Sequence, residues 1–198
     1  SGLRDETHWV HMEIFEGSYG GRFVKDGMDA VDTLYANTRN NPIEDIESHL
    51  PMRVTRYELR EDTCGAGRTR GGVGACRAFQ FLEPGGFSVE GEGHKFPPWG
   101  FKGGAEGKPA ELHLIHPDGS EESLVSKVPY RAAAAGDTFL AVGPSAGGYG
   151  PAFKRDPAAV LDDVLDGIVS VESAERQYGV VIRDGVVDAT ATAAKRSA

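Results

Sequence analysis

The chain has 198 residues, and its 39% hydrophobic and 26% charged content excludes a disordered polypeptide. Its net charge of -9 argues against nucleic-acid binding, which needs a basic face, and against a polybasic surface for membrane binding. No apolar run reaches the roughly 18 residues of a transmembrane helix.

The N-terminal part of the chain predicts one strand and two helices. Residues 7–16 predict a strand, because apolar and polar residues alternate along them. A glycine loop at 17–22 follows. Residues 26–37 predict a helix from apolar residues at helical spacing, and Pro42 suits the first position of a short helix over 43–49.

The middle of the chain is predicted to be rich in β-structure. Strands are expected over residues 52–60, 75–82, 110–115, 122–128 and 137–142. The clearest pair is the hairpin around Pro117-Asp118-Gly119, because proline fixes φ and glycine accepts a positive φ in a tight turn.

The C-terminal part predicts two helices and a small hairpin. Asp156 caps the first helix before Pro157, and Ser170 caps the second, which stops at Gly179. A short hairpin turns on Asp184-Gly185. The expected fold is therefore α+β: a β-rich domain with long glycine loops and a C-terminal helical pair.

The predicted domain organisation is one domain over residues 1–188 followed by a flexible tail at 189–198, whose residues are small. Cys64 and Cys76 are too few for a disulfide scaffold, and they match no zinc motif. A cytoplasmic location is therefore expected. His8 and His11 would point to opposite faces of a strand, so no metal site is expected in this chain.

The 27 glycines are about twice as frequent as the average of about 7%, and they gather in clusters. These clusters lie at residues 17–21, 65–74, 85–107 and 143–150. The last cluster has no P-loop or dinucleotide motif. Its bare backbone amides could hold an anion, or it could be a tight glycine corner.

Polar and basic residues offer further candidates without a diagnostic arrangement. The stretch Asn37-Thr38-Arg39-Asn40-Asn41 is costly to bury without partners, so it is either a surface cap or the wall of a polar cleft or interface. Arg53 and Arg77 could clamp a carboxylate or phosphate, or form ion pairs with acidic residues of the 47–62 segment. No known catalytic motif names a reaction.

A series of motifs nevertheless follows a characteristic order along nearly the whole chain. They include Glu16-Gly17-Ser18-Tyr19-Gly20-Gly21-Arg22, Asn37-Thr38-Arg39-Asn40-Asn41-Pro42, Arg70-Gly71-Gly72-Val73-Gly74, Lys95-Phe96-Pro97-Pro98-Trp99-Gly100 and Gly147-Gly148-Tyr149-Gly150. This order resembles the hydantoinase B, 5-oxoprolinase and acetone (acetophenone) carboxylase family. Family members are much longer, so the chain resembles the C-terminal portion of a B-type subunit, either as a processed or split piece or as a separately encoded subunit.

The resemblance implies a cytoplasmic, hetero-oligomeric, ATP-dependent enzyme. A partner subunit similar to hydantoinase A would use ATP and Mg²⁺ to phosphorylate a carbonyl or amide oxygen of a small-molecule substrate. The B-type subunit would then hydrolyse a cyclic amide or support carboxylation of an enol phosphate. A divalent metal is implied only in the N-terminal half of the B-type subunit, so the isolated chain is expected to be inactive.

The resemblance also marks candidates for substrate or anion binding, with Arg22, Arg39 and Arg70 as the expected anion contacts. The full set is Ser18, Tyr19, Arg22, Asn37, Arg39, Asn40, Arg70, Gly147, Gly148 and Tyr149. No catalytic residue is assigned. The alternative is a non-catalytic module that completes the B-type subunit and docks the kinase-like partner.

Overall fold

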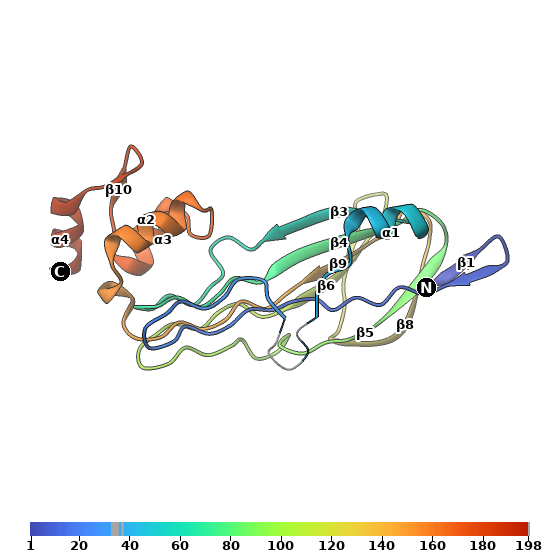
Figure 1. The fold of residues 1–198 in the computed structure, drawn as a ribbon, viewed down its shortest axis with the longest axis horizontal. Helices are drawn as coiled ribbons and strands as arrows, with labels where there is room; N and C mark the ends of the chain where they lie inside the picture. Colours follow the sequence, from blue (N-terminus) through green and yellow to red (C-terminus); the bar gives the residue numbers. More distant parts are fainter. Residues whose placement is uncertain (33–35, 37, 198) are drawn as a thin grey trace.

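The structure is a computed structural model that describes residues 1–32, 36 and 38–197. The molecule is elongated: β-sheets lie at one end, helices from the C-terminal part lie at the other, and long extended segments run between them (Figure 1). The described residues form a mixed α+β fold with three antiparallel sheets, which agrees with the expected class.

The largest sheet contains the strands that the sequence predicted in the middle of the chain. Its order is β3 (Met52–Leu59), β4 (Ala75–Phe81), β9 (Thr138–Val142), β6 (Glu111–Ile115) and β7 (Glu121–Ser123). The predicted hairpin turn is confirmed, because β6 pairs with β7 and Gly119 has a φ of 83° between them. The single strand predicted over 122–128 is wrong, since β7 ends at Ser123 and Lys127–Ala133 is a strand of another sheet. Strand β4 is almost completely buried between β3 and β9.

The second sheet was not recognised in the sequence. Its order is β2 (Thr7–Trp9), β1 (Gly2–Arg4), β5 (Gly85–Glu90) and β8 (Lys127–Ala133). The sequence predicts no strand over residues 85–90, and the strand that it predicts over 122–128 overlaps β8 only at residues 127 and 128. The prediction of one strand over 7–16 is correct only for Thr7–Trp9, since residues 10–16 have no strand pairing. Alternation describes the faces of an extended segment, but a strand also needs a neighbour to pair with.

An aromatic core joins the two sheets. The Phe87 ring from β5 lies 4.6 Å from the Phe139 ring of β9, centroid to centroid. Phe15, from the unpaired segment, meets Phe79 and Phe139 edge to face at 5.9 Å. The inward residues of that segment therefore belong to the core even though its backbone joins neither sheet.

The helix predicted over 26–37 is wrong for residues 26–32, which form no helix. Residues 33–35 and 37 lie outside the described part of the chain. Backbone hydrogen bonds explain the difference, because the Tyr19 amide donates to the Met28 carbonyl and the Ala30 amide donates to the Val73 carbonyl. These long-range bonds satisfy groups that a helix would have used locally. The short helix α1 (Ile43–His49) does form, with Pro42 one position earlier than expected, at the N-cap.

The glycine clusters form a distinct layer that we call the glycine bundle: residues 17–30, 64–74, 99–107 and 143–150. Backbone groups join its segments directly, as in the bonds from the Gly21 amide to the Gly147 carbonyl (2.9 Å) and from the Gly148 amide to the Ala105 carbonyl (2.9 Å). A Cβ at Gly71 would overlap the Ala146 carbonyl oxygen. Glycine is required here because backbone packs on backbone.

The C-terminal elements follow their predicted caps. They are the 3₁₀ helix η1 (Ala152–Lys154), the helices α2 (Pro157–Leu165), α3 (Val171–Tyr178) and α4 (Ala189–Ser197), and the hairpin strands β10 (Ile182–Arg183) and β11 (Val186–Val187). Asp156 accepts from the Ala158 amide, Ser170 accepts from the Ser173 amide, and Gly179 ends α3 with a φ of 65°.

Helix α4 occupies residues for which the sequence had predicted a flexible tail. The Arg196 side chain on this helix donates to the Tyr178 carbonyl (3.0 Å) and to the Arg155 carbonyl (2.9 Å). Thr192 is buried and its hydroxyl accepts from the Val181 amide. These contacts hold the helix against the preceding elements. Among the described helices, none is long and apolar enough to cross a membrane.

The glycine bundle makes a stability prediction. Gly71→Ala should destabilise the fold by about 3 kcal/mol or more, because the new Cβ meets a backbone that cannot move without breaking hydrogen bonds. Gly20→Ala is the matched control, since its Cβ would meet nothing closer than 3.6 Å. Urea denaturation followed by circular dichroism measures both, and equal midpoints would contradict the packing argument.

Candidate functional site

A polar cleft lies beside the glycine bundle, with a volume of about 650 Å³. Its described lining residues are Glu16, Tyr19, Arg22, Met28, Ala30, Val31, Asp32, Thr38, Arg39 and Asn40. Of the predicted site residues, four are therefore brought together: Tyr19, Arg22, Arg39 and Asn40. Asn37 lies outside the described residues. Of the polar stretch, Thr38, Arg39 and Asn40 line this cleft, and Thr38, Arg39 and Asn41 are exposed, so both interpretations of the stretch remain open.

Two arginines, Arg22 and Arg39, line the cleft together with two acidic residues, Glu16 and Asp32. Arg39 is exposed and forms no ion pair with any described residue. Arg22 is also exposed, and its guanidinium donates to the Asp26 backbone carbonyl at 2.8 Å. Within residues 1–32, 36 and 38–197 it forms no ion pair with a carboxylate. Guanidinium groups with free donors recognise carboxylates and phosphates through paired hydrogen bonds. This arrangement suits an anionic or strongly polar ligand.

Glu16 is the unusual acid of the cleft. Its side chain is buried, and no described residue forms a hydrogen bond with its Oε2 atom. Burial raises the pKa of this carboxyl above its ordinary value, because removing the charged form from water is unfavourable. A buried carboxyl with a free oxygen can accept a hydrogen bond when ionised or donate one when protonated.

A buried charge cluster, which we call the Arg77 cluster, stands behind the cleft. Arg77 on β4 is only 1% exposed, and its Nη1 atom lies 3.0 Å from a Glu13 carboxylate oxygen. The Tyr57 ring of β3 covers the guanidinium at 4.5 Å, and Asn40 Oδ1 accepts from it at 3.4 Å. The observed partner, Glu13, is not one of the acidic residues of the 47–62 segment that the sequence analysis named for Arg77.

The partners of Arg77 were missed in the sequence. His11 lies 2.8 Å from Glu13, and both side chains are nearly buried. Burial alone would raise the Glu13 pKa, but the hydrogen bond from His11 and the Arg77 charge outweigh it, so the pKa is lowered. Their signal was the second face of the 7–16 segment, where His11, Glu13 and Phe15 alternate with the exposed residues.

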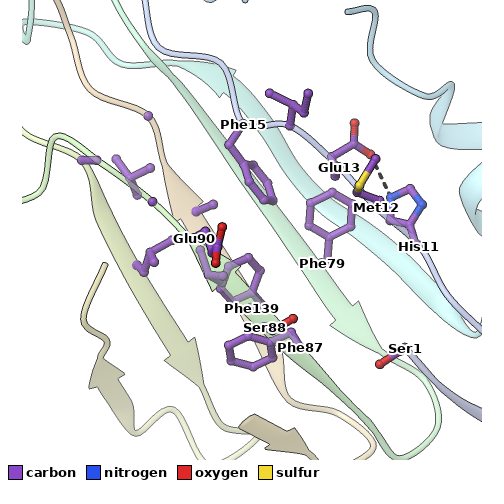
Figure 2. Close-up of a pocket in the computed structure, with 18 of the residues that line it drawn as sticks. Ser1, His11, Met12, Glu13, Phe15, Phe79, Phe87, Ser88, Glu90 and Phe139 are labelled. Carbon is purple, nitrogen blue, oxygen red and sulfur yellow. Dashed lines mark hydrogen bonds and ion pairs between the residues drawn. The ribbon is translucent and has the colours of Figure 1, made fainter. Parts of the chain in front are cut away.

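An aromatic cavity of about 550 Å³ lies between the two larger sheets. Figure 2 shows the rings of Phe15, Phe79, Phe87 and Phe139 gathered along it, with the bond between His11 and Glu13 at one side. Its lining is mostly apolar, so it suits an apolar group rather than an anion. The polar cleft is therefore the better candidate for the predicted anion contacts.

Arg70 lies outside the cleft, in a buried ion network. Its guanidinium donates to Asp163 at 2.7 Å and to Asp29 at 2.8 Å, and these carboxylates raise its pKa against the opposing effect of burial. Arg155 donates to the other Asp163 oxygen at 2.8 Å and to Asp26 at 2.7 Å. Two carboxylates therefore bind each guanidinium. Because Asp163 lies on α2 and Asp26 and Asp29 lie in the glycine bundle, the network links these two parts of the fold.

The remaining candidates belong to the glycine bundle. The Ser18 hydroxyl donates to the Gly72 carbonyl at 2.8 Å and accepts from the Ala146 amide at 2.9 Å. The Gly147 carbonyl and the Gly148 amide are occupied by backbone partners. Tyr149 packs against aromatic rings at one end of the bundle. These four residues are therefore not brought into the cleft.

No group of three or more His, Cys, Asp or Glu side chains among the described residues could hold a metal ion. Cys64 and Cys76 are both free and buried, and burial raises the pKa of the Cys64 thiol to about 11. A thiol with so high a pKa remains protonated near neutral pH and is a poor nucleophile or metal ligand.

Comparison with known proteins identifies the class. The model of the Hydantoinase B/oxoprolinase family matches residues 1–152, and the chain belongs to this family. A relative from Pseudomonas sp. (strain NS671), which carries the name of a D-/L-hydantoinase B-type subunit, is 55% identical over 185 residues. The matched region covers 93% of this chain and 31% of the relative.

Two solved structures share the fold. The crystal structure of the ATP-dependent caprolactamase from Pseudomonas jessenii has a TM-score of 0.79 and 33% identity, covering 93% of this chain and 33% of that chain. A nucleotide-free acetone carboxylase structure has a TM-score of 0.76 at 21% identity, covering 92% of this chain and 29% of that chain, and indicates the fold alone. The chain spans about a third of the length of the proteins it matches.

The raised pKa of Glu16 predicts a pH-dependent stability. The folded protein holds the Glu16 proton more tightly than the unfolded chain does, so ionised Glu16 lowers stability at pH 7, and this loss disappears as the pH falls toward about 4.3. Glu16→Gln should therefore stabilise the protein at pH 7 more than at pH 5. Thermal melts at both pH values test this, with the exposed Glu61→Gln as the control.

The buried ion network makes a second prediction. Asp163→Asn removes the carboxylate that Arg70 and Arg155 share, so it should cost about 3–5 kcal/mol of unfolding free energy. Asp162→Asn, at the exposed neighbouring position, should change stability by less than about 0.5 kcal/mol. A similar urea midpoint for both variants would show that the network does not stabilise the fold.

Proposed function

We propose that the chain is a portion of a B-type subunit in an ATP-dependent enzyme of the hydantoinase, oxoprolinase or ketone carboxylase kind. The observation that carries the proposal is the polar cleft, in which, among the described residues, Arg22 and Arg39 have no carboxylate partners and the buried Glu16 Oε2 accepts no hydrogen bond. Family membership and the names of the relatives support it.

In this proposal the cleft receives a small-molecule substrate whose carbonyl or amide oxygen has been phosphorylated. The Arg39 and Arg22 guanidiniums bind the phosphoryl oxygens, and the Asn40 amide and the Tyr19 hydroxyl orient the rest of the molecule. Phosphorylation converts a poor leaving oxygen into a good one, so hydrolysis of a cyclic amide or carboxylation of an enol phosphate can follow.

In this proposal, the nucleotide and metal sites of the enzyme lie on other polypeptide segments. A hydantoinase A-like partner subunit holds ATP and Mg²⁺, and the N-terminal portion of the B-type subunit holds a divalent metal. The assembly is a cytoplasmic hetero-oligomer, and this chain binds neither nucleotide nor metal. By itself it lacks the residues that complete the reaction, so we expect it to be inactive alone.

A second candidate function is a non-catalytic module that completes the B-type subunit and docks the ATP-using partner. The observation that favours it is the engagement of Arg70, Ser18 and the 147–148 glycines within the fold, where they support structure. In that case the polar cleft would contact another polypeptide segment, and changing its arginines would alter assembly rather than turnover.

Arg39 separates the two candidates. In the assembled complex, Arg39→Ala should lower kcat/KM by about tenfold or more while the subunits still co-purify, because a charge-assisted contact to substrate is lost. Arg53→Ala on β3 is a matched exposed control and should leave turnover unchanged. Unchanged turnover in Arg39→Ala would reject the substrate-binding role, and loss of co-purification would favour the docking module.

A further inference from the structure

Residues 10–15 form a segment whose backbone is unused. No backbone hydrogen bond joins this segment to any other described residue. Its side chains nevertheless hold it in place, because Glu13 contacts Arg77 and Phe15 packs in the aromatic core. A strand-like segment with unpaired amides and carbonyls is an open edge that another strand can join.

Strand β5 has a second open edge. Strand β8 occupies one side of β5 along its length, whereas β1 pairs with the other side only at Gly2 and Gly85. The Ser1 amino group donates to the Gly86 carbonyl, and the Gly86 amide donates to the Ser1 carbonyl, both at 2.9 Å. Beyond this contact, no strand of the described residues pairs with this side of β5. Residues 87–90 therefore leave this edge open.

The two open edges border the aromatic cavity. Residues 10–15 and 86–92 line it, and its other lining residues include Phe79 from β4, in the large sheet. Figure 2 shows Glu13 on one side of the Phe79 ring and Ser88 on the other. The cavity therefore lies between two unpaired strand edges, over an aromatic floor.

The sheet order shows which strand belongs between these edges. Strand β1 lies between β2 and β5, and Gly2 pairs with Trp9 on one side and Gly85 on the other. Both pairings are antiparallel, so each step backward along β1 is a step forward along both neighbours. A continuation of β1 backward beyond Ser1 would therefore enter the aromatic cavity, between residues 10–15 and β5.

The inward side chains of the two edges agree with this register. The first residue before Ser1 would lie between His11 and Phe87, and the third would lie between Glu13 and Val89. His11 and Glu13 are nearly buried, and Phe87 and Val89 pack against the aromatic core. Residues opposite one another share a face of a sheet, so the first and third residues before Ser1 would point at the aromatic floor.

The outward side chains agree as well. The second residue before Ser1 would lie between Met12, which is 81% exposed, and Ser88, which is also exposed. Val10, opposite Ser1 itself, is 78% exposed. The two edges are therefore in phase with each other and with β1. A missing central strand requires this agreement, whereas a pocket for a small molecule does not.

We propose that the residues directly preceding Ser1 in the B-type subunit, which we call the leading segment, fill the aromatic cavity as a continuation of β1. The inference rests on the part of the proposed function in which this chain is a portion of a longer subunit. The chain spans about a third of the length of its relatives. The register selects the leading segment over a strand of another subunit, because β1 already points into the cavity. Apolar residues are expected at its first and third positions before Ser1, over the rings.

Filling the cavity would also support the polar cleft. Residues 10–15 lead directly to Glu16, which lines the cleft, and their Glu13 holds the buried Arg77. Pairing with the leading segment would give this stretch the backbone hydrogen bonds that it lacks. The leading segment would therefore hold both carboxylates in position.

Cysteine pairing in the complete B-type subunit tests the register. Met12→Cys should form a disulfide with a cysteine at the second residue before Ser1, because residues directly opposite have Cβ atoms about 4.5–5.5 Å apart. The matched control places that cysteine at the third residue before Ser1, which faces the core and should not join Met12→Cys. Mass spectrometry of the linked peptides measures both yields. Equal yields from the two pairs, or no disulfide in either, would overturn the proposal.

Hydrogen exchange in the complete B-type subunit tests whether the cavity is filled. The amides of residues 10–15 should be protected, and aspartate at the first residue before Ser1 should accelerate their exchange about tenfold or more, because it places a charge over the aromatic floor. Aspartate at the second residue before Ser1 faces outward and should leave exchange unchanged. Rapid exchange of residues 10–15 in the wild type would mean that no strand pairs there and would overturn the proposal.

The outcomes separate this inference from the proposed function. If the matched cysteines do not join while Arg39→Ala loses turnover as expected, the leading segment lies elsewhere and the proposed function stands. If the cysteines join and Arg39→Ala keeps its turnover, the cavity is filled as proposed and the substrate-binding role fails. Protection of residues 10–15 that appears only after the ATP-using subunit is added would assign the cavity to that subunit and overturn the proposal.

Discussion

Direct packing of backbone on backbone in the glycine bundle is the constraint on which the rest of the structure depends. Segments that are far apart in the chain approach so closely that a Cβ at Gly71, Gly104 or Gly147 would overlap a neighbouring carbonyl group. The amides and carbonyls of these segments satisfy one another without forming regular strands. The bundle thereby connects the sheets to the C-terminal helices and fixes the positions of the residues at its edges (Figure 1).

The arginines fall into two groups: those that are buried in ion pairs and those that are exposed. Arg70 and Arg155 are buried and share Asp163, while Arg77 is buried against Glu13 and under the Tyr57 ring. Such buried pairs are strongly destabilising to break, because the partner left behind has no water around it. Arg22 and Arg39 are the opposite case: they are exposed, and they form no ion pair with a carboxylate in the described part of the chain.

The fold was predictable where a local signal sufficed. The caps at Asp156 and Ser170 and the stop at Gly179 act within one helical turn, and the structure has them as predicted. The helix predicted over 26–37 does not form at residues 26–32, because the Gly27 and Ala30 amides donate to the distant Arg70 and Val73 carbonyls. The sheet of β1, β2, β5 and β8 was not predicted, because β5 begins with two glycines that resemble a turn. Its strands also pair with partners that are distant in the sequence.

The sequence by itself determined the family, through the order of its motifs, and the α+β class, through periodicity and caps. Only the tertiary structure decided which candidates share a site. It brought Tyr19, Arg22, Arg39 and Asn40 to one cleft beside Glu16, and it engaged Arg70 in a buried ion network. The physical reason is that a guanidinium binds whichever carboxylate lies within reach, and the fold alone sets those distances. An arginine in a sequence motif therefore indicates that a guanidinium is present. Only its neighbours in the structure show whether carboxylates of the same chain already bind that guanidinium.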